Sequence, residues 1–320
     1  MNPSLDLVFV CDCTGSMGSY LAAVRENILD IAQAIYAQTG ASIRFSLVQY
    51  RDHPPEDCSF VVRACPFVTT VQEISVYLNM LSACGGGDGP EALADGLFAA
   101  LNLEWRPEAA KVAIVITDAP PHGLEASMDG FPNGCPCGND PLRIAREMAR
   151  CGIVCYTVGA EPTLSEVYNL ARDFLRALAA ITGGRFVSLS SADSLASVIV
   201  GSAVEEIELC DLMSRVSLEA KKLPVQSKFD VIQNVTHSLQ RQNVLTTKLD
   251  VRDAYMGQLP PLPDAWHSVP NITSVRSAIP PSGPRVVPIV PGSVDSVRKD
   301  AVDIDQVARA FERLMKIGEC

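Results

Sequence analysis

The chain has 320 residues, of which 48% are hydrophobic and 20% charged, as in globular proteins large enough to bury a full core. Its formal net charge of −11 argues against a nucleic-acid-binding protein, which needs cationic surface to neutralise phosphates. The first apolar run is flanked by Asp6 and Asp12, unlike a signal peptide, and later apolar runs are too short to span a bilayer, so we expect a cytoplasmic protein.

The first 200 residues alternate between short apolar runs and segments with helical periodicity. Residues 5–12 are rich in β-branched and aromatic side chains, as buried strands are, whereas residues 19–40 repeat apolar side chains every three or four positions and end in glycine, as amphipathic helices do. These criteria predict strands at 5–12, 42–52, 59–70, 111–121, 153–160 and 185–190. They predict helices at 19–40, 71–87, 90–105, 140–152, 165–184 and 193–223.

This alternation predicts an α/β protein with a doubly wound, mostly parallel sheet. The strands are almost continuously apolar, which indicates that helices cover both faces of the sheet. The run at 59–70 contains Pro66, which is tolerated in an edge strand, so we expect this strand or hairpin at an edge.

The character of the chain changes after the last predicted helix. We expect one α/β domain at 1–224, a helical extension at 225–259, a Pro-rich linker at 260–295 and a short amphipathic helix within 296–320. The linker is predicted because residues 260–291 hold nine of the 22 prolines. The C-terminal helix is expected either to dock on the domain or to bind a partner.

Polar side chains gather where three predicted segments meet one edge of the sheet. They are Asp12, Thr14 and Ser16 after the first strand, Asp88 and Glu91 in the loop "GGGDGPE", and Asp118 after the strand at 111–121. In open α/β sheets, ligands bind outside the carboxyl ends of the strands. Carboxylate and hydroxyl oxygens are the ligands that hard cations such as Mg²⁺ prefer, so this edge is a candidate cation site.

These motifs resemble the von Willebrand factor A domain and its metal-ion-dependent adhesion site. The family signature D-x-[S/T]-x-S is matched by Asp12, Thr14 and Ser16, and the later family aspartate by Asp118. The combination "DCTGSM", "YRDHPP", "GGGDGPEA" and "ITDAPPHG" is similar to domains of this type attached to alpha-kinases. The resemblance covers roughly residues 4–200.

The resemblance implies a six-stranded sheet of order 3-2-1-4-5-6 with one antiparallel edge strand. It also implies Mg²⁺ or Mn²⁺ held with one open position, which an Asp or Glu of a protein partner fills. The family normally supplies a Thr from its second loop; here Asp88, or Glu91, occupies that loop. An added carboxylate should strengthen cation binding and weaken the attraction of the cation for an incoming carboxylate.

The function that follows is an intracellular protein-interaction module that binds a partner carboxylate through a divalent metal. The alternatives are a Mg²⁺-dependent hydrolase and a kinase-associated scaffold. For a hydrolase, Asp52 and His53 are the only obvious candidates for a general base. Asp52, His53, Glu91 and His122 are otherwise expected to lie around the metal ligands or at the rim of the site, and a kinase domain is not recognised in the sequence.

The loop at 122–140 is long for a connection in an α/β protein and leaves the sheet at the same edge, so it is a candidate partner surface. It contains Cys135 and Cys137 in a C-x-C pair. Zinc sites normally use C-x₂-C pairs or added histidines, so this spacing disfavours zinc, and the role of the two thiols is left open.

Overall fold

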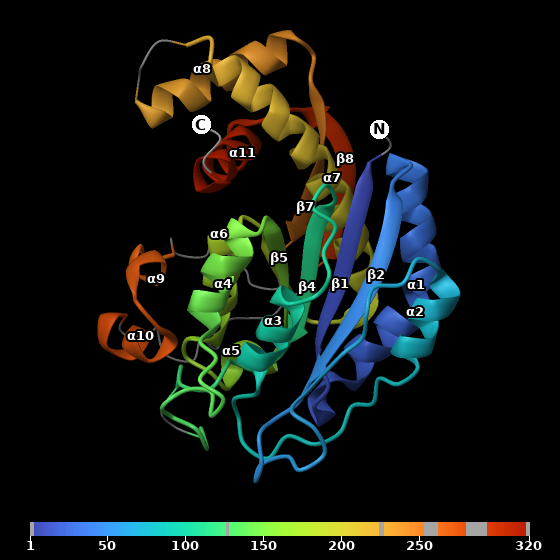
Figure 1. Ribbon diagram of the computed structural model, residues 1–320, viewed down its shortest axis with the longest axis vertical. Coiled ribbons are helices and arrows are strands. Elements are labelled where there is room, and N and C mark those ends of the chain that lie inside the picture. The colour runs from blue at the N-terminus through green and yellow to red at the C-terminus, as the bar shows by residue number, and fades with distance from the viewer. Residues whose placement is uncertain (1–2, 126–127, 224–226, 253–261, 280–292, 318–320) are drawn as a thin grey trace.

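The computed structural model describes residues 3–125, 128–223, 227–252, 262–279 and 293–317 (Figure 1). Its centre is a six-stranded sheet of order β3-β2-β1-β4-β5-β6. Only β3 among these strands is antiparallel to its neighbour. The strands are β1 (Ser4–Asp12), β2 (Ser42–Tyr50), β3 (Val62–Ala64), β4 (Ala110–Thr117), β5 (Ile153–Ala160) and β6 (Phe186–Leu189). The predicted fold class and strand order are therefore confirmed.

Helices cover both faces of the sheet. One face packs on α1 (Gly18–Thr39), α2 (Val71–Leu78) and α7 (Leu195–Ala220); the other packs on α3 (Leu93–Leu101), α4 (Pro141–Arg150), α5 (Thr163–Glu166) and α6 (Ala171–Thr182). Successive side chains of β1 enter the two cores alternately, Leu7 and Phe9 on one side, Val8 and Val10 on the other. Burial on both sides explains why the strands lack polar alternation.

Several elements are shorter than the sequence predicts. The helix predicted at 165–184 is divided into α5 and α6, because the Glu125 carboxylate accepts the backbone N–H groups of Asn169 and Leu170 at the start of α6. The edge strand predicted at 59–70 keeps only three residues, since Pro66 lacks the N–H that would continue the ladder.

A second, smaller core surrounds the C-terminal half of α7, which extends past the sheet (Figure 1). It contains α8 (Lys228–Arg241), the antiparallel pair β7 (Leu245–Arg252) and β8 (Ser293–Ala301), and α11 (Ile304–Ile317). The helical interpretation of 225–259 is thus corrected at β7, whose start, "LTTKL", favours a strand because of its β-branched threonines. The C-terminal helix docks on the chain itself: Arg313 pairs with Glu206 of α7.

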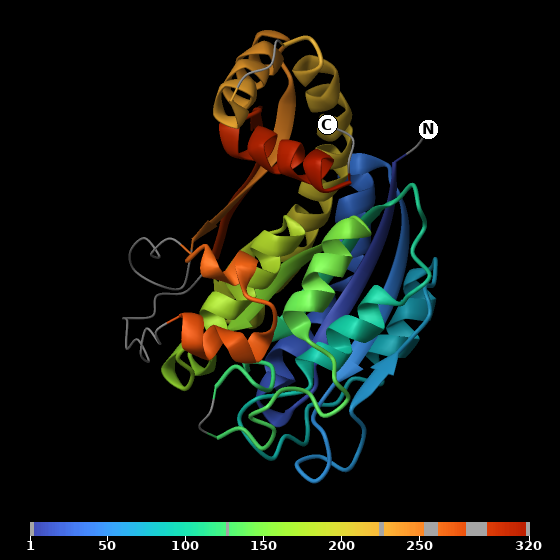
Figure 2. The same cartoon turned by 60° about the vertical axis from the view of Figure 1, so that its left-hand side comes forward.

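The interpretation of 260–295 as a linker is corrected for residues 265–278. They form α9 (Ala265–Ser268) and α10 (Ile272–Ala278), which pack beside α6 and α4 (Figure 2). Trp266 is fully buried there, with its ring 6.3 Å from that of Phe174. Prolines shorten these helices, but the apolar side chains between them still find a surface to bury. Residues 260–261 and 280–292 of the predicted linker lie outside the described residues.

None of the helices in the described ranges offers an apolar stretch long enough to cross a bilayer.

Candidate metal centre

The candidate site lies at the carboxyl ends of β1 and β4, at the lower end of Figure 1 and opposite α8 and α11. Asp12 is completely buried and its carboxylate is fixed by three hydrogen bonds. Oδ1 accepts the backbone N–H of Thr14 at 2.9 Å and its hydroxyl at 2.6 Å, and Oδ2 accepts the hydroxyl of Thr117 at 2.9 Å. The D-x-T spacing therefore closes a tight turn that holds the Asp12 and Thr14 oxygens together.

Ser16 and Asp118 complete this side of the site. Ser16 is exposed and lies in the short 3-10 helix Gly15–Met17 that precedes α1. Its hydroxyl hydrogen-bonds to Asp118, a buried residue directly after β4. Strands β1 and β4 are hydrogen-bonded neighbours, so their last residues share one edge of the sheet. The structure thus brings Asp12, Thr14, Ser16 and Asp118 into one cluster.

The glycine-rich loop lies directly on this cluster. Cys84 donates its backbone N–H to Cys13 O at 3.1 Å, and Gly15 donates to Gly85 O at 3.3 Å. Gly86 has φ +85°, and a Cβ atom there would lie 2.9 Å from Glu91 Oε1 and 3.3 Å from Thr14 Cβ. The loop therefore needs glycine at this position, and its close packing places the Glu91 carboxylate beside Thr14.

The cluster carries negative charge that the surrounding described residues do not neutralise. Burial, and then the carboxylates of Asp12, Asp52, Asp88 and Asp118, raise the pKa of Glu91 to about 11. Burial and then Asp118 raise the pKa of Asp12, and burial raises that of Asp118. Within the described residues, no Lys or Arg forms an ion pair with these three carboxylates. The three carboxyl groups therefore hold protons more tightly than usual, and a bound cation would have the same neutralising effect.

Asp88 belongs to a neighbouring cluster rather than to the group around Asp12. It hydrogen-bonds to Asp52, and these two carboxylates and His122 have ligand atoms within 4.8 Å of one another. His122 lies 2.6 Å from Asp52 Oδ1 through Nε2 and 2.8 Å from Asp129 Oδ1 through Nδ1. Burial lowers the pKa of His122, but its hydrogen bonds to Asp129 and Asp52 outweigh burial and raise the pKa to about 9.

His122 is therefore an imidazolium buried between two carboxylates, not a side chain at the rim. The neighbours Asp52 and His53 point to different places: Asp52 faces His122, whereas His53 Nε2 lies 3.0 Å from Asp95 Oδ2. The sequence interpretation gave Asp95 no role at the site. A usable signal for Asp95 was its place among apolar residues on the buried face of α3.

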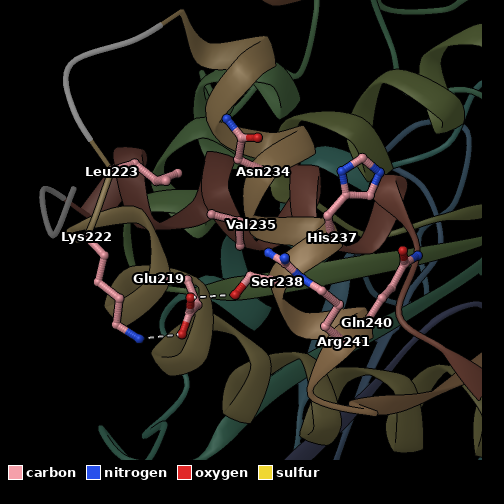
Figure 3. A pocket seen from close by; sticks show the side chains of 9 residues that line it. All are labelled: Glu219, Lys222, Leu223, Asn234, Val235, His237, Ser238, Gln240 and Arg241. Atoms are coloured by element: carbon pink, nitrogen blue, oxygen red, sulfur yellow. Dashed lines mark hydrogen bonds and ion pairs between the residues drawn. The ribbon is translucent and has the colours of Figure 1, made fainter.

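A separate groove lies between the end of α7 and α8, far from the strand carboxyl ends (Figure 3). Glu219 in this groove accepts hydrogen bonds from Ser238 at 2.7 Å and from Lys222 at 2.6 Å. Its lining residues are Glu219, Lys222, Leu223, Asn234, Val235, His237, Ser238, Gln240 and Arg241. Glu219 thus has hydrogen-bond donors from the protein itself, in contrast to Glu91 Oε2 at the strand ends.

Comparison with known proteins agrees with this architecture. Residues 6–199 match the family model of the von Willebrand factor type A domain. The chain is 32% identical over 137 residues to the alpha-protein kinase vwkA of Dictyostelium discoideum, covering 42% of this chain and 22% of that protein. It is 30% identical over 194 residues to the putative ariadne-like RING finger protein R811 of Acanthamoeba polyphaga mimivirus, covering 58% of this chain and 18% of that protein. The match thus spans about a fifth of each relative.

Similar solved structures include the pilus adhesin SpaC of Lactobacillus rhamnosus GG, with 15% identity and a TM-score of 0.47 over 64% of this chain and 30% of that one. A von Willebrand factor type A protein of Catenulispora acidiphila has 16% identity and a TM-score of 0.45 over 64% of this chain and 43% of that one.

Proposed function

Because the chain belongs to the von Willebrand factor type A domain family, we propose that its strand-end cluster binds Mg²⁺ or Mn²⁺ and, through the cation, an Asp or Glu of a partner protein. The intracellular location predicted from the sequence is part of this proposal. The observation that carries it is the convergence of three buried carboxylates, from three separate loops, without a protein cation beside them.

The donor atoms present fit a hard divalent cation. All are carboxylate or hydroxyl oxygens, which Mg²⁺ and Mn²⁺ prefer. Glu91 Oε2 is buried and has no hydrogen-bond partner among the described residues, so this oxygen is left without the partner that a buried polar atom normally has. Burial and then repulsion between the carboxylates raise the pKa values of Asp12 and Glu91, and a bound cation would neutralise that repulsion.

We propose that Asp12, Thr14, Ser16 and Asp118 hold the cation and that Glu91, rather than Asp88, is the contribution of the glycine-rich loop. This assignment follows from the position of Glu91 beside Thr14, whereas Asp88 lies with Asp52 and His122. Ser16 is exposed, so the cation would face solvent on that side and attract a partner carboxylate there.

The two alternatives have less support. For a hydrolase, the candidate bases are occupied: Asp52 accepts from His122, and His53 pairs with Asp95 away from the cation cluster. A scaffold attached to a kinase agrees with one relative, an alpha-protein kinase, but the matched residues are only 22% of that protein. Phosphoester turnover that depends on Asp118 would favour the hydrolase.

The test is Mg²⁺-dependent thermal stability of the wild type, of Asp12→Ala, and of Asp30→Ala as an exposed control on α1. We expect millimolar Mg²⁺ to raise the melting temperature of the wild type and of Asp30→Ala by mass action, and to leave Asp12→Ala unchanged. Equal responses of the wild type and Asp12→Ala would exclude the proposed cation site.

Partner recognition is tested with a carboxylate probe. We expect an Asp-containing peptide to bind in the presence of Mg²⁺ or Mn²⁺, measured by calorimetry, and the matching Asn peptide to bind at least tenfold more weakly. Chelator should abolish binding of the Asp peptide. Equal binding of both peptides, with or without metal, would contradict the carboxylate-binding role while leaving the cation site intact.

A further inference from the structure

Four side chains outside the proposed cation site around Asp12 lie close together at the loop between β4 and α4. They are His53 after β2, Asp95 on α3, and Cys135 and Cys137 between β4 and α4. One ligand atom from each lies within 4.8 Å of the ligand atoms of the other three. Two thiols, an imidazole and a carboxylate are a different donor set from the oxygens around Asp12, and they are the donors that zinc takes in proteins.

Three of the separations between these atoms are close to those in a tetrahedral zinc site. Cys135 Sγ lies 3.6 Å from His53 Nε2 and 3.0 Å from Asp95 Oδ2, and these two atoms are 3.0 Å apart. In tetrahedral zinc sites the metal–ligand bond lengths place neighbouring ligand atoms roughly 3.3–3.8 Å apart. These three separations are therefore within about half an ångström of those in a tetrahedral zinc site, and Cys137 Sγ lies within 4.8 Å of the other three atoms.

Groups around the cluster orient its ligands. Asn139 Nδ2 donates to Asp95 Oδ1 at 2.8 Å, which leaves Oδ2 facing the thiols and the imidazole. The backbone N–H of Cys137 donates to Cys135 Sγ at 3.3 Å, and the Cys137 thiol also hydrogen-bonds to Asp95. Such contacts fix ligand orientation in metal sites, and the backbone N–H that Cys135 accepts favours the thiolate form of this sulfur.

Two of the four ligands are buried, whereas Cys135 is partly buried and Cys137 is exposed. His53 and Asp95 are 4% and 6% exposed, so their desolvation must be compensated by the partners they face. Without metal, burial and then Asp95 raise the pKa of Cys135 to about 12, which keeps the thiol protonated. A divalent cation would instead favour two thiolates next to Asp95 and neutralise most of the resulting charge.

We propose that His53, Asp95, Cys135 and Cys137 form a structural Zn²⁺ site. All four positions come from this chain, so the site is closed, as structural zinc sites are. Zinc would tie the loop 131–139 to α3 and to the segment after β2. The same loop region supplies Asp129 to His122 and the Gly130 N–H to Asp88, so zinc would also fix the wall of the neighbouring cluster.

The test is metal analysis of the full chain expressed in zinc-supplemented medium and purified in Mg²⁺ buffer. We expect one equivalent of zinc in the wild type and in Cys151→Ser, which removes an exposed thiol elsewhere. The double variant Cys135→Ser/Cys137→Ser should lose at least nine-tenths of the zinc. Asp12→Ala should keep its zinc, which distinguishes failure of this site from failure of the magnesium site.

A measurement on the wild type alone covers the case in which the double variant does not fold. A thiol-specific mercurial should release the zinc stoichiometrically, and Co²⁺ replacement should give the absorption bands of tetrahedral thiolate-bound cobalt. Absence of zinc from the wild type, zinc retained in the folded double variant, or a Cys135–Cys137 disulfide in place of free thiols would overturn the proposal.

Discussion

The two ends of the central sheet treat buried carboxylates in opposite ways. At the amino ends of the strands, Asp6 accepts hydrogen bonds from Arg44 at 2.9 Å and from Arg106 at 2.8 Å. Close by, the second core pairs Glu206 of α7 with Arg313 of α11. At the carboxyl ends, Asp12, Glu91 and Asp118 have hydroxyl and carboxyl neighbours and no ion pair with Arg or Lys among the described residues.

The pKa values of the buried carboxyl groups shift in opposite directions at the two ends. Burial alone would raise the pKa of Asp6, but its hydrogen bonds to Arg44 and Arg106 outweigh burial and lower it. At the other end burial and carboxylate neighbours act together, and the pKa of Glu91 is raised to about 11. The fold can therefore supply a guanidinium to a buried carboxylate. Where it does not, as at Glu91, we propose that an external cation binds.

The largest expected effect is the loss of stability in a variant that breaks the buried ion pair between Arg313 and Glu206. Arg313→Ala would leave Glu206, which is 1% exposed, buried without its partner, and would also remove the hydrogen bond to Gly183 O. Removing one partner of a buried ion pair costs about 3–5 kcal/mol, so we expect a loss of that size in the free energy of unfolding. Chemical denaturation at neutral pH measures it.

Two variants sharpen this result. Arg215→Ala breaks an exposed pair with Asp211 on α7 and should change stability by under about 1 kcal/mol. The double variant Arg313→Met/Glu206→Leu removes both charges and should recover most of the loss, because no unpaired charge stays buried. A small effect of Arg313→Ala alone would mean that protein cations are not what stabilises carboxylates at this end.

The second expected effect is the stability of Glu91→Gln, which should differ from that of the wild type in one way without Mg²⁺ and in another way with Mg²⁺ bound. Without metal at neutral pH, Glu91→Gln should be more stable than the wild type, because folded Glu91 keeps a proton that the unfolded chain releases, whereas glutamine is a neutral group of the same shape with no proton to lose. With Mg²⁺ at about 100 times its dissociation constant, the wild type should gain about 2.7 kcal/mol and Glu91→Gln much less.

Thermal or chemical unfolding with and without Mg²⁺ measures both states. Glu166→Gln, an exposed glutamate on α5, is the matched control and should gain as much as the wild type. Should Asp88→Gln lose the Mg²⁺ response while Glu91→Gln keeps it, the assignment of Glu91 would be wrong and that of Asp88 restored.

Much of the fold was predictable because it follows from local pattern. Continuous apolar strands and periodic helices predicted the α/β class and the mostly parallel sheet, and the family resemblance implied the strand order. The turn of Asp12, Thr14 and Ser16 was also predictable, since it is local in sequence. The short helix around Trp266 was not, because its prolines suggest a linker and the surface that buries Trp266 is formed by distant segments.

The other residues of the two candidate sites could not be predicted from residue spacing in the sequence, because they meet only through contacts between distant segments. Whether Asp88 or Glu91 faces Thr14 is decided by the backbone of Gly85 and Gly86, both with positive φ. The thiols at 135 and 137 lack the usual zinc spacing, because the other two donors are 40 and 82 residues away in the chain from Cys135. Only the folded sheet edge brings these residues together.

The smallest expected effect is the pH dependence of stability without metal. Since the pKa of Glu91 is raised from 4.5 to about 11, the folded protein keeps a proton that the unfolded chain loses above pH 4.5. The free energy of unfolding should therefore fall with rising pH, by up to about 1.4 kcal/mol per pH unit. Asp6, with its lowered pKa, adds stability above its ordinary value of 3.8 that is lost only at lower pH.

A window from about pH 5 to 6.5 isolates the strand-end carboxylates. His122, whose pKa is raised from 6.5 to about 9, loses its stabilising contribution only as the pH rises above that window. Within it, the metal-free wild type should lose stability with rising pH, and Glu91→Gln should give a flatter curve. Saturating Mg²⁺ should flatten the wild-type curve as well, because the cation favours the ionised carboxylates. A metal-free wild type that instead gains stability across this window would show that the strand-end carboxylates hold no extra proton, and the contrast between the two ends of the sheet would disappear.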